Sequence, residues 1–151
     1  MSRTLAIDPG PQQSGWVLMD GGRVVDSGVH PNADVRAWVR DGQGADVLVI
    51  ETMQANYADT VGASVLQTLV WIGRFVECWR DPDSVRLISR QSVKAVVCNG
   101  NTRANDAGVR QALIDLLGPP GTKKAPGPTY GVKSHAWAAL AVAVAAERGA
   151  D

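Results

Sequence analysis

The sequence has few cysteines and no apolar run long enough to cross a membrane. Its two cysteines, Cys78 and Cys98, lack Cys-x-x-Cys spacing and companion histidines, so we expect free thiols rather than a disulfide or a zinc site. The longest apolar run, residues 136–146, is far shorter than the roughly 20 residues of a membrane-spanning helix. A basic segment followed by an apolar stretch, typical of an export signal, is also missing. These absences favour a cytoplasmic protein that makes no membrane contact.

The chain has no net charge, with 15 basic and 15 acidic residues, but the two signs are unevenly distributed. Residues 1–83 hold 6 Lys and Arg against 11 Asp and Glu, whereas residues 84–151 hold 9 against 4. A basic half favours a polyanionic partner such as nucleic acid. Intermixing of the halves in the fold would cancel the asymmetry, so charge alone does not decide between these interpretations.

Short apolar runs separated by turns predict five strands. Three of them form an antiparallel meander, with Gly21-Gly22 as the tight hairpin connection, and the fourth is a continuous apolar run typical of a strand buried on both faces. The expected strands cover 4–8, 15–19, 23–29, 47–50 and 85–88. Helical spacing or composition predicts helices over 33–40 (capped by Asn32), 62–79, 92–98, 106–117 and 136–148.

The stretch 118–133 (GPPGTKKAPGPTYGVK) is rich in Gly, Pro and Lys, which predicts a flexible loop. A length of 151 residues fits one domain, and no repeat or second domain is visible. The order of elements is similar to the RNase H-like plan. We therefore expect a single α/β domain over 1–151, with a three-layer fold and a mixed sheet made of the meander and two parallel strands.

Two of the apolar strands end in an acidic residue, Asp8 and Glu51. If these strands are parallel neighbours, both carboxylates emerge at the same edge of the sheet. Adjacent carboxylates repel, so such a pair indicates a shared proton or a bound cation, and oxygen ligands favour Mg²⁺ or Mn²⁺. The alternative is that each acid only caps the segment that follows it.

His135, at the start of the last expected helix, is a candidate third ligand. It would face the same edge if Leu140 and Val144 are buried. A lone histidine serves many roles, including capping and core packing, so its type alone does not decide its function.

Four segments together resemble the RuvC-type Holliday-junction resolvases of the RNase H-like superfamily. The resemblance covers nearly the whole chain in the right order and is greatest to the short resolvases carried by bacteriophages. The segments are LAIDPGPQQSGWVLMD, VLVIE, RQSVKAVVCNGNTRANDAGVRQAL and SHAWAALAVAV.

The resemblance implies a structure-selective endonuclease that hydrolyses phosphodiester bonds in Holliday junctions or other branched DNA, as a homodimer. It implies two Mg²⁺ ions, with Mn²⁺ as a substitute, at a separation of about 3.5–4 Å around the scissile phosphate. Asp8 would bridge both ions and Glu51 would ligate one. His135 stands where the family has Asp or His.

Two positions depart from the family pattern. Most members have a further Asp one helical turn after position 135, where this chain has Ala138. A three-ligand site completed by water, a replacement ligand from elsewhere, or a protein that binds junctions without cutting well would each account for this change. Asn105-Asp106 lies near the place where many members have a DNA-contacting Lys, and Arg103 is a nearby substitute.

The stretch 90–133 supplies the expected DNA-binding surface, since neutralising phosphates provides most non-specific affinity for DNA. Lys94 matches a Val-Lys pair of the family, and Tyr57 is placed to stack on an unpaired base at the junction centre. A solvated loop is the alternative for the lysines. The expected contacts are Arg90, Lys94, Arg103, Arg110, Lys123, Lys124, Lys133 and Tyr57.

The long helix over 62–79 could form the dimer interface through Val65, Leu69, Ile72 and Val76, although packing on the sheet accounts for the same stripe. An exposed Trp71 or Trp79 would favour the interface.

Two rival classes remain. Asp-x-Gly after a first strand also begins the phosphate loop of ATP-binding proteins of the actin and sugar-kinase type, but those need two such domains, so we expect no nucleotide cofactor. The stronger rival is a branched-DNA binding module with a weakened or inactive metal site, which Ala138 favours.

Overall fold

The computed structural model describes residues 2–53 and 62–150. These residues form five strands, five helices and one 3-10 turn, beginning with three consecutive strands and ending with three consecutive helices. The first five elements are β1 Arg3–Asp8, β2 Gln13–Asp20, β3 Arg23–Pro31, α1 Asn32–Asp41 and β4 Val47–Thr52. They are followed by α2 Ala63–Cys78, η2 Pro82–Ser84, β5 Arg86–Ser89, α3 Arg90–Val97, α4 Asp106–Leu117 and α5 Ala136–Glu147.

The strands form one five-stranded sheet in the order β3-β2-β1-β4-β5. β1 and β2 pair antiparallel, as do β2 and β3, and this is the predicted meander. β1 and β4 pair parallel, with Ile7 opposite Ile50, and β4 pairs parallel with β5. The predicted mixed α/β sheet is therefore confirmed, and β1 lies at its centre.

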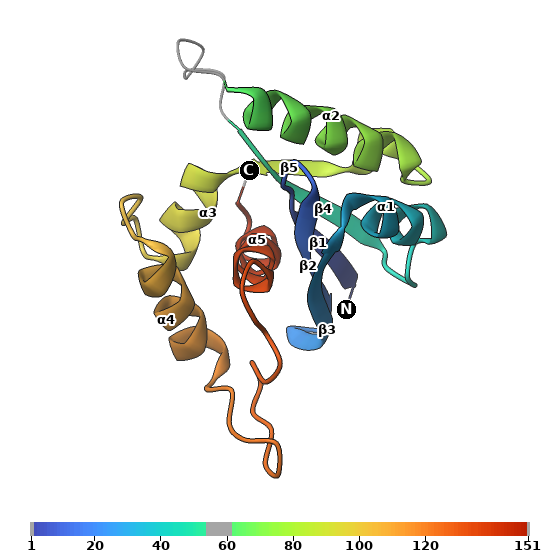
Figure 1. Cartoon of the computed structure of the whole chain (residues 1–151). Coiled ribbons are helices and arrows are strands. Elements are labelled where there is room, and N and C mark those ends of the chain that lie inside the picture. The colour runs from blue at the N-terminus through green and yellow to red at the C-terminus, as the bar shows by residue number, and fades with distance from the viewer. Residues whose placement is uncertain (1, 54–61, 151) are drawn as a thin grey trace.

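Helices cover both faces of the sheet and produce three layers (Figure 1). α5 lies against one face, with α3 and α4 packed outside it, and α1 and α2 cover the other face. Apart from its last residue Glu147 and the half-buried Ala138, every residue of α5 is buried. A helix that is apolar on all sides fits a position between the sheet and two other helices. Leu140 and Val144 are buried, as the placement of His135 required.

The buried face of α2 matches the predicted stripe only in part, at the buried Ile72 and at Val76, which packs against the core. Thr68, Ile72 and Phe75 face the sheet, whereas Leu69 is 41% exposed. Periodicity placed the stripe one residue to the side, because apolar residues occur on more than one face of this helix. Trp79 is buried beyond the end of α2 and Trp71 is half-buried, so neither is the exposed tryptophan that would favour an interface.

The segment 118–133 contains no helix or named strand, as expected, but hydrogen bonds join parts of it. Thr122 and Ala125 exchange backbone hydrogen bonds, and an isolated bridge joins Gly121 to Pro126. The buried Thr129 donates its hydroxyl to the carbonyl of Gly118 at 2.9 Å. The flexibility of this loop stays a prediction.

Two further expectations can be compared with the structure. Cys78 and Cys98 are free thiols, as predicted. Within 2–53 and 62–150, none of the helices combines the length and apolar character needed to span a bilayer.

Candidate functional site

The two acidic strand ends lie side by side. Asp8 is the last residue of β1 and Glu51 the fifth residue of β4, and the parallel register that pairs Ile7 with Ile50 brings both to the same edge of the sheet. Their side chains are only 15% and 13% exposed. The predicted placement of the two carboxylates is therefore confirmed, and each is held by a strand at the middle of the sheet.

The turn after Asp8 is fixed by a buried asparagine. Asn32 is 1% exposed, and its amide donates to the carbonyl of Gly10 at 2.9 Å while its side-chain oxygen accepts from the Ser14 hydroxyl. The backbone N–H of Asn32 donates to the carbonyl of Gln12 at 2.9 Å. The predicted helix cap at Asn32 is wrong: Pro31 is the N-cap of α1, and the Asn32 side chain holds the turn after Asp8 instead.

A glycine allows α5 to begin close to Asp8. Gly15 on β2 is the cross-strand partner of Asp8, and a Cβ at Gly15 would collide with the backbone carbonyl of His135. His135 is the N-cap residue of α5, and its Nδ1 lies 3.5 Å from Oδ2 of Asp8. The absence of a side chain at Gly15 therefore brings the imidazole to the carboxylate, although the imidazole remains 67% exposed.

Burial makes both carboxylates costly to ionise. Desolvation raises the pKa of Asp8 to about 6, against the opposing effects of His135 and Arg90, which favour the charged form. Desolvation also raises the pKa of Glu51 to about 7, and the neighbouring charge of Asp8 raises it further. Two carboxylates that are close together and poorly solvated have a strong electrostatic affinity for a cation.

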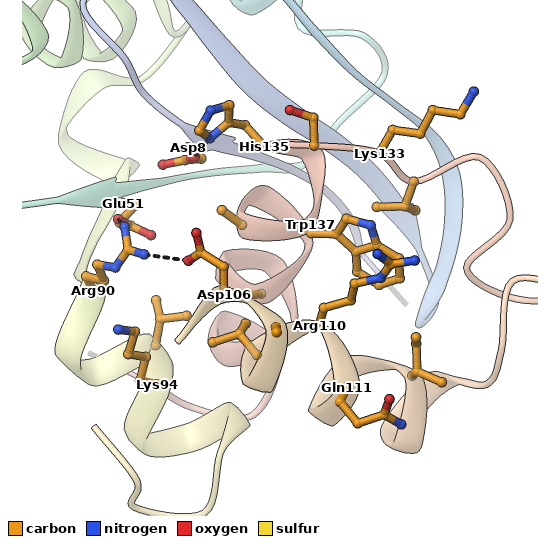
Figure 2. Close-up of a pocket in the computed structure, with 18 residues that line it drawn as sticks. Asp8, Glu51, Arg90, Lys94, Asp106, Arg110, Gln111, Lys133, His135 and Trp137 are labelled. Atoms are coloured by element: carbon orange, nitrogen blue, oxygen red, sulfur yellow. Dashed lines mark hydrogen bonds and ion pairs between the residues drawn. The ribbon is translucent and has the colours of Figure 1, made fainter. Parts of the chain in front are cut away.

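The carboxylates open into a cavity of about 950 Å³ between β1, β4 and helices α3, α4 and α5. Figure 2 shows basic side chains from three segments around it. Of the predicted site residues, Asp8, Glu51, Arg90, Lys94, Arg110, Lys133 and His135 line this cavity. Arg103, Lys123 and Lys124 are exposed elsewhere, and Tyr57 lies outside the described residues.

Sequence reasoning assigned no site role to three residues that line the same cavity, Asp106, Gln111 and Trp137. The Arg110 guanidinium lies over the ring of Trp137, 5.0 Å from its centroid. From sequence, a tryptophan within the apolar last helix is expected to be a core residue. The packing of α4 on α5 is what places Trp137 beneath Arg110. Ala138 also lines the cavity, so the departure from the family pattern occurs at the site itself.

Arg90 links the two sides of the cavity. Its Nη2 donates to Oδ1 of Asp106 at 2.9 Å, and its Nη1 lies 4.0 Å from Oε1 of Glu51 (Figure 2). The Asp106 side chain is 92% exposed, so this ion pair lies at the open side of the cavity. Ser89 caps α3 and Asn105 caps α4, which leaves the first residue of each helix, Arg90 and Asp106, available for this contact.

The chemistry of the carboxylate pair suits a divalent cation, because hard oxygen donors that are shielded from solvent favour Mg²⁺ or Mn²⁺. Within the part of the chain that the structure describes, no three His, Cys, Asp or Glu side chains converge closely enough to hold a metal by themselves. Asp8 is close to His135 and lies beside Glu51, but the three do not converge. Because Mg²⁺ ordinarily retains several waters, a centre with few protein ligands is compatible with binding, and the ligand role of His135 stays a prediction.

The sheet order β3-β2-β1-β4-β5, with acidic residues on the neighbouring parallel strands β1 and β4, defines the RNase H-like class of α/β fold. Among solved structures, this chain is similar to the Thermus thermophilus RuvC structure, with a TM-score of 0.69 over 98% of this chain and 97% of that chain. It is also similar to T. thermophilus RuvC in complex with Holliday junction substrate, with a TM-score of 0.62 over 96% and 92% of the two chains.

Sequence identity is 18% in both comparisons, so the likeness is one of fold, and the expected RuvC-type fold is confirmed. Neither protein-family models nor curated protein sequences give a match.

Proposed function

We propose that this chain is a structure-selective DNA endonuclease that resolves Holliday junctions or other branched DNA by metal-dependent phosphodiester hydrolysis. The observation that carries the proposal is the pair of desolvated carboxylates, Asp8 and Glu51, at adjacent strand ends in a cavity lined by basic side chains. The fold likeness to RuvC, which has been solved with a Holliday junction substrate, supports the same substrate class.

Asp8 and Glu51 would hold the metal, for which we propose two Mg²⁺ ions with Mn²⁺ as a substitute. The bound ions would supply the Lewis acidity that phosphodiester hydrolysis requires. The chain's own contribution is rigidity: both carboxylates are on central strands, and Asn32 fixes the turn after Asp8. His135, whose Nδ1 lies 3.5 Å from Oδ2 of Asp8, would complete the metal shell or orient that carboxylate.

Basic residues around the carboxylates would receive the DNA backbone. Lys94 from α3, Arg110 from α4 and Lys133 from the segment before α5 line the cavity at different places around it (Figure 2). Neutralising phosphates with such cations releases counterions and makes the affinity fall with salt. Arg103, Lys123 and Lys124 would contact DNA outside this cavity, and Tyr57 would stack on an unpaired base of the junction.

We further propose that a second copy of the chain docks on α2, because a junction with two-fold symmetry needs two nicks. Leu66, Leu69 and Val70 are 55%, 41% and 60% exposed, and their spacing places them on one side of the helix. This stripe is separate from Ile72 and Phe75, which pack on the sheet. An exposed apolar stripe on a helix that is already packed favours a protein partner.

The test is cleavage of an end-labelled four-way junction in Mg²⁺. We expect wild type to make paired symmetric nicks, and Asp8→Asn to bind the junction without nicking it. In the same assay, Leu66→Glu/Val70→Glu should sediment as a monomer and lose paired nicking, whereas Val25→Glu, at an apolar position of β3 that is 51% exposed, should stay dimeric and active.

Ala138 at the cavity wall favours one second candidate, a branched-DNA binding module with a weakened or inactive metal site. Wild type that binds the junction but does not nick it in Mg²⁺ or Mn²⁺ would support that module and contradict the nuclease. Nicking that persists in Asp8→Asn would contradict the assigned site.

A further inference from the structure

Arg90 is shared unequally between two carboxylates from different elements. Its Nη2 is 2.9 Å from Asp106 on α4, whereas its Nη1 is 4.0 Å from Glu51 on β4. The first contact is a direct hydrogen bond and the second is a longer electrostatic contact. The guanidinium therefore lies beside Glu51 and is bonded to Asp106.

The direction of Asp106 is not explained by helix capping. Asn105 supplies the cap of α4, accepting from the N–H of Gly108 at 2.8 Å. A carboxylate in the first turn of a helix interacts favourably with the helix dipole, and this interaction does not require the side chain to point in one particular direction. Asp106 nevertheless makes its hydrogen bond across the cavity, to the first residue of α3 (Figure 2).

Without Asp106, the nearest carboxylate for Arg90 would be Glu51. A guanidinium paired directly with Glu51 would compete with a divalent cation for the same oxygen atoms. It would also withdraw the positive charge from the open side of the cavity, where a DNA phosphate would approach. The ion pair with Asp106 prevents both effects.

We propose that Asp106 is a positioning residue that holds Arg90 beside Glu51, so that the carboxylate pair stays open to the metal and the guanidinium stays available to a DNA phosphate. This inference rests on the proposed nuclease function. The inference gives a role to Asp106, which lies near the position where many members of the resembled family have a DNA-contacting lysine. Arg103, the substitute considered from sequence, does not line the cavity, and Arg90 supplies the cation from α3 instead.

The experiment measures Mn²⁺ binding by titration calorimetry at pH 8 and single-turnover junction cleavage for the same proteins. Asp106→Asn should weaken Mn²⁺ binding by about three- to fivefold, because Arg90 would move onto Glu51. This factor corresponds to the free energy that an exposed ion pair typically contributes. Arg90→Gln should bind Mn²⁺ at least as tightly as wild type but cleave more slowly, because a phosphate contact is lost. Arg90→Gln/Asp106→Asn should bind Mn²⁺ like Arg90→Gln, since Asp106 acts through Arg90.

Two further variants complete the comparison. Asp106→Glu keeps a carboxylate for Arg90 and should restore most of the Mn²⁺ affinity. Asp115→Asn removes another exposed acid of α4, which accepts a hydrogen bond from Gln111 but does not itself line the cavity, and should match wild type in both measurements.

Two results would overturn the inference. Mn²⁺ affinity of Asp106→Asn equal to that of wild type would mean that Asp106 has no effect on the metal centre. Weakening by Asp106→Asn that persists in the Arg90→Gln background would make Asp106 a metal ligand rather than a positioning residue. Wild type that binds no Mn²⁺ would instead contradict the metal centre of the proposed function.

Discussion

The cavity has two unlike sides. The strand side presents Asp8 and Glu51, which are largely buried and held by the central strands β1 and β4. The helix side presents Arg90, Lys94 and Arg110, which extend from α3 and α4 toward solvent. The groups proposed to hold a metal are therefore on the sheet, whereas the groups proposed to meet DNA are on long side chains that extend from helices.

This difference separates two energetic costs. The strand side stores unfavourable free energy, because two neighbouring carboxylates lose solvent and their pKa values rise to about 6 and 7. The helix side stores little, because its ion pair is exposed to solvent and such pairs contribute about 1 kcal/mol or less. Removal of a strand-side carboxylate should therefore raise stability and lower activity, whereas removal of a cavity-lining lysine on the helix side should act mainly through DNA binding.

The largest effect is expected for Glu51→Gln. Cleavage should fall on the order of a thousandfold, as when a charge-stabilising group is removed from a transition state. The metal-free protein should nevertheless be about 2 kcal/mol more stable than wild type at pH 8, because a buried charge is gone. Urea unfolding in EDTA measures the stability, with Asp115→Asn as a control that should leave it unchanged.

The pH dependence follows from the same carboxylates. Their pKa values are higher in the folded chain than the ordinary 3.8 and 4.5, so the folded state binds more protons than the unfolded state between about pH 4 and 7. The free energy of unfolding of metal-free wild type should therefore fall as the pH rises through that window. Glu51→Gln should show a smaller fall and match wild type near pH 4. An equal fall in both proteins would mean that Glu51 is not held in an unfavourable charged state.

Sequence reasoning succeeded where backbone pairing decides the geometry. Asp8 and Glu51 end apolar runs, and once β1 and β4 are parallel neighbours the two carboxylates must meet. The position of His135 near Asp8 was expected chiefly from the family resemblance, on the condition that Leu140 and Val144 are buried, and both are. The carboxylate pair needed only strand order, whereas the histidine needed the resemblance.

It failed where the packing angle between helices decides. The contact between Arg90 and Asp106 depends on how the first turns of α3 and α4 approach each other, which no local pattern encodes. The buried face of α2 was misassigned because apolar residues occur on several sides of that helix. Asn32 has the residue type of a helix cap, and only the fold shows that its side chain holds the turn after Asp8 instead.

A smaller effect, again on the strand side, is expected for Gly15→Ala. The added methyl group would meet the carbonyl of His135 and push the start of α5 away from β2. We expect a loss of about 1–3 kcal/mol in unfolding free energy and a fall in cleavage of about tenfold or more, because His135 moves relative to Asp8. Gly62→Ala, where a Cβ would meet nothing within 4 Å, is the control and should cleave like wild type. Normal cleavage by Gly15→Ala would mean that the distance between His135 and Asp8 is unimportant.

The smallest effect is expected for Lys123→Gln/Lys124→Gln, in the exposed segment before α5. These lysines do not line the cavity, so the cleavage rate at saturating junction should not change. Because a phosphate contact is lost, the magnitude of the slope of log affinity against log salt should fall by about 1. The cavity-lining Lys94→Gln should reduce both the magnitude of this slope and the saturated rate. The two variants are compared by junction binding at several salt concentrations, with Ca²⁺ in place of Mg²⁺. A slower saturated rate in Lys123→Gln/Lys124→Gln would place this segment within the catalytic machinery and remove the distinction between cavity-lining and outlying cations.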